Sequence, residues 1–223
     1  MKKTVTLEYD VLNDFAPVTP LVTASFVFVA RKTMPAKDLY ELIDWLKANP
    51  NKASAAIHIA DIRLIAAFLQ KETGTIFALV PYRGAAPAIT DLIAGQIDLF
   101  FATPLQLPLV RAGSLKAYAV ASEARLVLAP DIPTFAEMGL PALSYTSWFG
   151  LFAPKDTSRE IIAKLNGAAV EALDDLTVRS RFTDFGMEVF ARERQTPEAL
   201  AALQKADAKK WWPLIKEFGI KAE

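Results

Sequence analysis

The segment from Leu79 to Gly113 constrains the fold of this chain most, because its hydrophobic pattern changes from strand to helix and back with only short turns between. The apolar run Ile76–Val80 is typical of a strand, and the residues after Gly84 repeat at helical spacing. Gly95 ends this helix, and a second short apolar run at 97–101 follows it as a buried strand would. The segment therefore predicts a β-α-β unit with a further helix after it.

An arrangement of this kind favours one end of the sheet as the place for a ligand. In open α/β sheets, ligands bind outside the carboxyl ends of the strands. The turns Pro81–Gly84 and Ala102–Pro104 follow two of the expected strands. We therefore expect a binding site at these turns.

The alternation of strands and helices continues on both sides of this segment. Strands are expected at 21–30, 53–57 and 115–121, and helices between Pro35 and Pro50, at 60–71 and at 130–140. Beyond Thr146 we expect a strand at 147–153, helices from Thr157 or Ser158, at 178–185 and from Thr196, and a short strand at 187–191. Residues 20–146 thus predict one complete α/β lobe, and residues 1–19 and 147–223 the mainly helical remainder of another.

The composition indicates a packed protein without a strong charge preference. The chain has 223 residues, of which 52% are hydrophobic, enough for a sizeable core. Lysine plus arginine and aspartate plus glutamate both number 25, so the net charge is zero and no nucleic-acid partner is expected. The chain has no cysteine, which excludes disulfides and thiolate metal sites.

The motifs of common enzymes are missing. The sequence contains no GxSxG, P-loop, GxGxxG or HExxH pattern. Its one histidine, His58, lies close to Asp61, but two such side chains are too few for a zinc site. We therefore expect no catalytic residue, no metal and no cofactor, and an enzyme that uses His58 as a base is the least favoured interpretation.

Four ordered blocks carry a family resemblance: PYRGAAPAITDLIAGQIDLFF, RAGSLKAYAVAS, APDIPTFAEMGLP and SWFGLFAPKDT. They resemble the solute-binding receptors of tripartite tricarboxylate transporters, the Bug-type family of periplasmic binding proteins. The resemblance implies an α/β, periplasmic-binding-protein-like fold of type II, with one complete lobe and an incomplete second lobe formed by the two termini. It also implies binding of a small carboxylate in an interlobe cleft, with membrane transporter subunits as partners.

The resemblance begins near Tyr9, so the usual secretion signal and the N-terminal part of the first lobe have no counterpart in this chain. The family is periplasmic, whereas the chain as given would remain in the cytoplasm if Met1 is the native start. A start codon further upstream, a trimmed sequence and a shortened descendant are all compatible with the sequence.

Helices without the sheet that they normally cover would leave apolar faces open. We therefore expect a homodimer or a repacked terminal region. An alternative function follows from the same feature: a shortened interaction or regulatory protein that dimerises through exposed helix faces and has lost ligand binding.

The turn after the strand at 53–57 holds the first candidate site residues. His58 either donates to a ligand carboxylate or is a solvated turn residue. The resemblance implies small or hydroxyl-bearing residues around this position, where this chain has Ile57, Ile59 and Ala60. Such branched side chains would obstruct close approach to the backbone or fill the pocket. We count Ile57 and His58 as candidate substrate-binding residues.

The next strand ends supply further candidates. Tyr82 and Arg83 lie in the strongest motif of the resemblance; Arg83 would pair with a carboxylate through two hydrogen bonds, or else lies on the surface near a helix start. Thr103 offers a hydroxyl, while its neighbour Ala102 replaces the acid that is common in the family.

Two candidates lie where the chain crosses between the expected lobes. Ser147 would supply a hydroxyl to the ligand, and Trp148 an apolar wall. Large aromatic side chains are mostly buried for structural reasons, so core or hinge packing is the other interpretation of Trp148.

Overall fold

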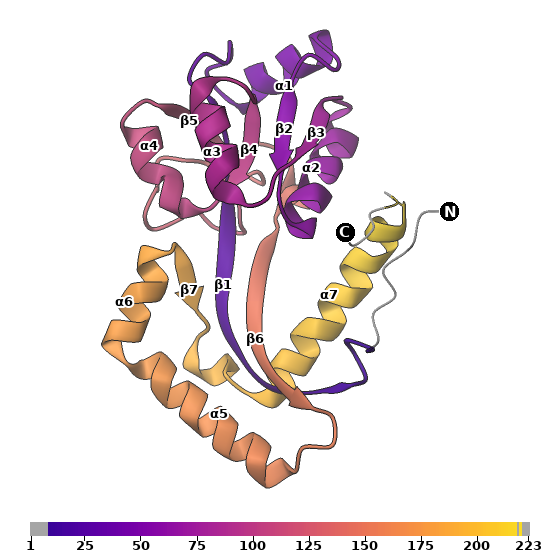
Figure 1. Cartoon of the computed structure of the whole chain (residues 1–223), viewed down its shortest axis with the longest axis vertical. Helices are drawn as coiled ribbons and strands as arrows, with labels where there is room; N and C mark the ends of the chain where they lie inside the picture. Colours follow the sequence, from indigo (N-terminus) through magenta and orange to yellow (C-terminus); the bar gives the residue numbers. More distant parts are fainter. Residues whose placement is uncertain (1–8, 218, 220–223) are drawn as a thin grey trace. The chain divides into compact units, whose positions relative to one another are not determined.

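The computed structural model describes residues 9–217 and 219 of the chain. These residues form two compact units (Figure 1). The central unit is residues 25–146, and the terminal unit consists of the residues up to Ala24 together with those from Ser147 onward.

The central unit is built on a mixed sheet with the strand order β3-β2-β4-β1-β5. The bounds are β1 Phe15–Arg31, β2 Ser54–Ile57, β3 Ala78–Pro81, β4 Leu99–Ala102 and β5 Leu115–Ala121. Strand β2 pairs in parallel with β3 on one side and β4 on the other, whereas β1 runs antiparallel to both β4 and β5. The expected β-α-β unit is present, and the three parallel strands end at the same edge.

Helices connect these strands, and their ends follow from local sequence. Their bounds are α1 Leu39–Ala48, α2 Ala60–Thr73, α3 Ala85–Ala94 and α4 Leu107–Arg111, the last preceded by a 3₁₀ turn, η1, at Pro104–Gln106. The Asp38 carboxylate caps α1 by accepting a 2.9 Å hydrogen bond from the Glu41 amide. Gly74 and Gly95 end α2 and α3 in the left-handed conformation that glycine adopts most easily. Figure 1 shows α3 lying in front of the sheet.

An aromatic cluster lies in the core of this unit. Phe28, on β1, stacks on Phe101 of β4 with ring centroids 4.6 Å apart, and Phe135 lies against both rings. All three side chains are buried. Burying a phenylalanine contributes roughly 1.5–3 kcal/mol, so this cluster is a main source of stability of the unit.

The prediction of a helix at 130–140 is wrong. Thr134 instead forms a bridge to Val120 of β5, and the Val120 amide donates to the Pro133 carbonyl over 2.8 Å. Thr134 and Glu137 then cap one another, with the Thr134 amide bonded to Glu137 Oε2 and the Glu137 amide to Thr134 Oγ1. Only a turn forms, because Gly139 adopts φ 80° and ends it.

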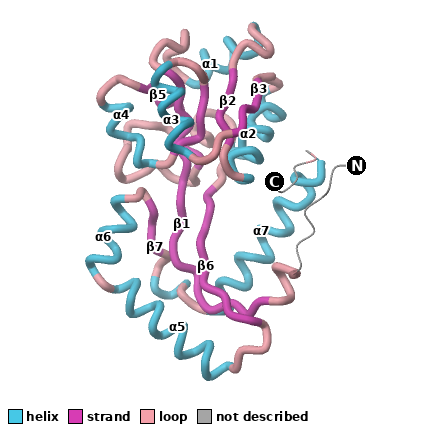
Figure 2. The backbone as a smooth tube through the Cα atoms, in the orientation of Figure 1, coloured by secondary structure: helices cyan, strands magenta, loops and turns pink. Residues whose placement is uncertain are grey.

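The terminal unit contains the first part of β1 and the elements β6 Thr146–Pro154, α5 Arg159–Asp174, α6 Leu176–Asp184, β7 Met187–Val189 and α7 Pro197–Glu217. Strands β6 and β7 both pair with β1. A short 3₁₀ turn lies at 192–194, and another, at 141–143, belongs to the central unit. Figure 2 shows α5, α6 and α7 as separate helices joined by loops and the short β7. The expected cap of α5 is Ser158, whose Oγ accepts from the Ile161 amide.

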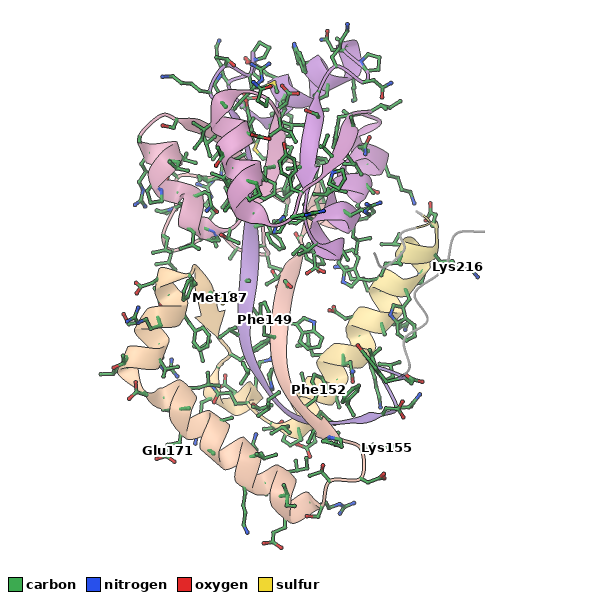
Figure 3. The ribbon with its side chains drawn as sticks, in the orientation of Figure 1. Phe149, Phe152, Lys155, Glu171, Met187 and Lys216 are labelled. Carbon is green, nitrogen blue, oxygen red and sulfur yellow. The ribbon has the colours of Figure 1, made fainter. Side chains whose placement is uncertain are left out.

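Close packing fixes β6 against α7. A Cβ added at Gly150 would come within 2.6 Å of Leu200 Cδ1, so the glycine allows the helix to approach the strand. Asn166 of α5 donates to the carbonyls of Val18 and Gln195, at 3.0 and 2.9 Å, and so links three segments of the unit. Phe149 and Phe152 project from β6 (Figure 3).

Candidate functional site

The candidate site is the edge of the central sheet at which β2, β3 and β4 end. Each of these strands leads into a helical segment: β2 into α2, β3 into α3 and β4 into η1. The residues at the three N-cap positions are Ile59, Gly84 and Thr103, and none of them caps its helix with a side-chain hydrogen bond. At the start of α3, the N–H groups of Ala85 and Ala86 therefore have no side-chain cap as partner. The turn η1 differs, because Pro104 has no N–H and the Gln106 amide donates to the Thr103 carbonyl.

The electrostatics of this edge favour an anion. A helix carries roughly half a positive charge at its N-terminus, and α2 and α3 are 14 and 10 residues long. The first turn of α3 contains no acidic residue, and that of α2 contains only Asp61. The exposed Arg83 side chain, directly before the start of α3, adds a full positive charge. Carboxylate and phosphate groups are the usual occupants of such an arrangement.

Gly84 gives α3 its open start. Its φ of 115° lies in a region that side chains with a Cβ rarely adopt, and nothing lies within 4 Å of a Cβ added there. The glycine is therefore required by the backbone conformation and not by crowding. Its missing side chain also leaves the first amides of α3 uncovered.

His58 follows β2, the middle strand of the three. Its ring lies beside that of the buried Phe100, with centroids 5.4 Å apart and planes at 51°. Nδ1 is buried and has no hydrogen-bond partner among the described residues. Burial lowers the pKa of His58 below its ordinary value, because a charged imidazole would lose solvation there.

The two isoleucines that flank His58 have different environments. The Ile57 side chain is buried in the core, and its carbonyl accepts a 2.7 Å hydrogen bond from the Tyr82 amide. Ile59 is exposed at the start of α2. Of the two, only Ile59 presents its side chain to solvent at the edge.

Tyr82 and Thr103 use their hydroxyl groups within the protein. The Tyr82 hydroxyl donates to Asp91 Oδ2 on α3 over 2.8 Å, and burial, followed by this carboxylate, raises the pKa of the phenol. The Thr103 hydroxyl lies 3.0 Å from Gln106 Oε1 and donates to it. Both side chains hold the turns in shape. Gln106 was not predicted; its place three residues after Thr103, in a turn that follows a strand, is the only signal in the sequence.

Ala102 does not lie in the turn but is the last residue of β4, and its side chain is completely buried. The core of the sheet therefore accommodates it as a small apolar residue.

Ser147 and Trp148 belong to the terminal unit, on β6. The indole N–H of Trp148 donates to the Asp207 carboxylate on α7. Packing of β6 against α7 is thus one role of this tryptophan. A ligand role for either residue stays a prediction.

The described residues contain no group of three or more histidine, cysteine, aspartate or glutamate side chains that could hold a metal ion. Asp98, near the amino end of β4, is used structurally: its carboxylate accepts from Arg31 Nε at 2.6 Å and from the Ser54 amide at 2.8 Å.

Comparison with solved structures defines the class of protein. The fold matches the periplasmic binding protein BugD with a TM-score of 0.84 at 30% identity, over 96% of this chain and 73% of that one. It matches MatC of Rhodopseudomonas palustris, solved with bound malate, with a TM-score of 0.84 at 33% identity, over 94% of this chain and 72% of MatC. The fold is that of periplasmic solute-binding proteins, which confirms the expected fold class.

The sequence gives the family within this class. Residues 2–220 match the model of the tripartite tricarboxylate transporter family receptor, and the chain belongs to this family of solute-binding receptors. A protein encoded in the TAR-I ttuE-ttuC' intergenic region of Agrobacterium vitis is 36% identical over 96% of this chain and 62% of that protein. The predicted resemblance is confirmed. The chain spans less than two thirds of the length of the first curated relatives that it matches.

Proposed function

We propose that the chain is a solute-binding protein for a small organic acid, held at the edge where β2, β3 and β4 end. The observation that carries the proposal is that three adjacent parallel strands each lead into a helical segment without a side-chain cap. Membership of the receptor family and the malate bound to MatC support a carboxylate as the anion. Binding alone is the function, and no bond of the solute is made or broken.

The residues at this edge have separate roles in the proposal. Backbone amides at the starts of α2 and α3 donate to one carboxylate, and the exposed Arg83 supplies long-range attraction and a second pair of donors. Tyr82 and Thr103 position the turns through their bonds to Asp91 and Gln106. A ligand role for Ser147 and Trp148 of β6 is also proposed, on the basis of membership of the receptor family.

Transporter subunits in the membrane and a periplasmic location are part of the same proposal, on the evidence of the family. No helix within the described residues has the length and apolar character needed to cross a bilayer. The chain would then deliver its solute to a membrane partner.

The second proposal is self-association through the terminal unit, with the chain acting as an interaction or regulatory protein. Its helices expose large apolar side chains: Ile161, Leu165, Leu176, Phe185 and Trp212. A homodimer that covers them would remove this surface from water. Light scattering after gel filtration tests it: a dimer that Leu176→Ser and Phe185→Ser together convert to monomer supports the proposal, and a wild-type monomer contradicts it.

Titration calorimetry with malate, other di- and tricarboxylates, and neutral amide analogues tests the binding function. We expect at least one acid to bind and its amide not to bind. Arg83→Gln should weaken the acid about tenfold, the loss of roughly 1.4 kcal/mol. Lys52→Gln is the matched control, because Lys52 is an exposed cation that precedes β2 at the opposite end of the strand. Equal affinity of both variants, or no binding by any acid, would contradict the proposal.

A further inference from the structure

His58 differs from the two hydroxyl-bearing candidates, Tyr82 and Thr103, because no hydrogen bond joins its side chain to the described residues. The Tyr82 and Thr103 hydroxyls both donate to neighbouring side chains. Of the two His58 nitrogens, Nδ1 is buried without a partner among the described residues, so Nε2 is the nitrogen through which the half-buried ring would contact a ligand. This imidazole is therefore available to a ligand.

Building on the proposed function, we infer that His58 is a specificity-determining residue, which acts as a neutral imidazole with its proton on Nε2 and donates to a second oxygen acceptor of the bound acid. The first carboxylate lies at the helix starts. The second acceptor is a carboxylate or hydroxyl oxygen of the same solute.

The tautomer follows from the burial of Nδ1. A proton on Nδ1 would be a buried donor without an acceptor, which is costlier than an unpaired acceptor atom beside an apolar ring. The neighbouring Phe100 ring supplies no acceptor oxygen. The proton therefore resides on Nε2, and the imidazolium form, which carries both protons, is disfavoured for the same reason.

Burial, and not a neighbouring charge, keeps the His58 ring neutral. Asp61 lies in the first turn of α2, and Arg83 follows β3. The end of β4 adds no titratable side chain, because Ala102, Thr103 and Pro104 occupy it. Burial lowers the pKa of His58, which keeps the ring neutral at pH 7.

The inference also specifies the class of solute. The edge offers amide donors, an imidazole donor and Arg83, while the Asp91 carboxylate already accepts from Tyr82 and the Ala102 side chain is buried and apolar. Asp61, in the first turn of α2, is a carboxylate at the same edge, but the donors outnumber it. The preferred solute is therefore an organic acid with a second oxygen acceptor, and malate should bind more tightly than aspartate.

The experiment uses the fact that His58 is the only histidine of the chain. Nitrogen-15 NMR of histidine-labelled protein reports its tautomer without ambiguity, with and without malate. We expect the Nε2-protonated neutral form at pH 7 in both states, and a shift of the Nε2 signal on addition of malate. An Nδ1-protonated or doubly protonated ring, or saturating malate with no change at Nε2, would overturn the inference.

Three variants separate the contact from a structural role. Gln places its amide nitrogen where Nε2 lies, so His58→Gln should bind malate within about threefold of wild type, whereas His58→Asn and His58→Phe should lose about tenfold. All three should melt within a few degrees of wild type, because Nδ1 makes no bond to lose. Equal losses in all three would overturn the inference. Failure of every acid to bind wild-type protein would instead overturn the proposed function, and the inference with it.

Discussion

The Tyr82 hydroxyl donates a 2.8 Å hydrogen bond to Asp91 Oδ2, which joins the end of β3 to the helix that follows it. The Tyr82 amide is bonded at the same time to the Ile57 carbonyl, at 2.7 Å, so one residue links two strand ends and a helix. The candidate site depends on this link, because it fixes the turn from which α3 starts.

Removing either partner of the hydrogen bond between Tyr82 and Asp91 should lower the stability of the protein by a similar amount. Tyr82→Phe and Asp91→Asn should each lower the free energy of unfolding by about 1 kcal/mol, the net worth of one hydrogen bond. The double variant should lose little more than either single one, since both remove the same bond. Urea denaturation measures all three, and fully additive losses would show that the bond contributes nothing.

Asp98 should affect stability without affecting binding. Its carboxylate accepts from Arg31 Nε and from both the amide and hydroxyl of Ser54, at the amino end of the strands. Asp98→Ala should lower the free energy of unfolding by about 2 kcal/mol, since several partly buried donors lose their acceptor. Malate affinity below the melting temperature should stay unchanged. A large loss of affinity in the folded variant would contradict the placement of the site at the opposite edge.

Replacing Gly84 and replacing Gly167 by alanine should have opposite effects on stability. Gly84 has a φ of 115°, so Gly84→Ala strains the backbone and should destabilise the protein by about 1–3 kcal/mol although the space is open. Gly167 lies inside α5 and also has nothing within 4 Å of an added Cβ. Gly167→Ala should therefore stabilise by about 0.4–1 kcal/mol. Thermal melting of both variants checks the pair; destabilisation by Gly167→Ala would contradict it.

Glu137 should contribute to acid sensitivity. The Arg125 side chain and the Thr134 amide bond to its carboxylate and lower its pKa below the ordinary value of 4.5. The stabilisation is complete above that ordinary value and is lost as the pH falls through the lowered pKa. Melting temperatures from pH 6 downward should therefore fall more steeply for wild type than for Glu137→Gln. Parallel curves would show that the charge is not coupled to folding.

Most of the alternating strands and helices could be predicted from the sequence, because they depend on local hydrophobic periodicity and on glycines that end helices. Strand β5 and the start of α7 at Pro197 lie where they were expected. The helix expected at 130–140 failed because the bridge from Thr134 to Val120 is a long-range contact that no local pattern contains. The antiparallel pairing of β1 in the middle of the sheet was not foreseen for the same reason.

The candidate site was predictable by position but not by chemistry. Strand ends indicated His58, Tyr82 and Thr103, since ligands bind at such ends. Whether a hydroxyl is free or already bonded depends on the side chain opposite, and the bond from Thr103 to Gln106 is visible only in the structure. The buried Nδ1 of His58 likewise depends on packing that the sequence does not encode locally.

The most direct test of binding at the edge formed by β2, β3 and β4 is a malate titration followed by backbone amide NMR. We predict that the largest saturable shifts belong to the first amides of α2, from Ala60, and of α3, from Ala85, with little change near Asp98 at the other end of the strands. Saturable binding that leaves the amides of both helix starts unchanged, or no binding of malate or any other organic acid, would contradict it.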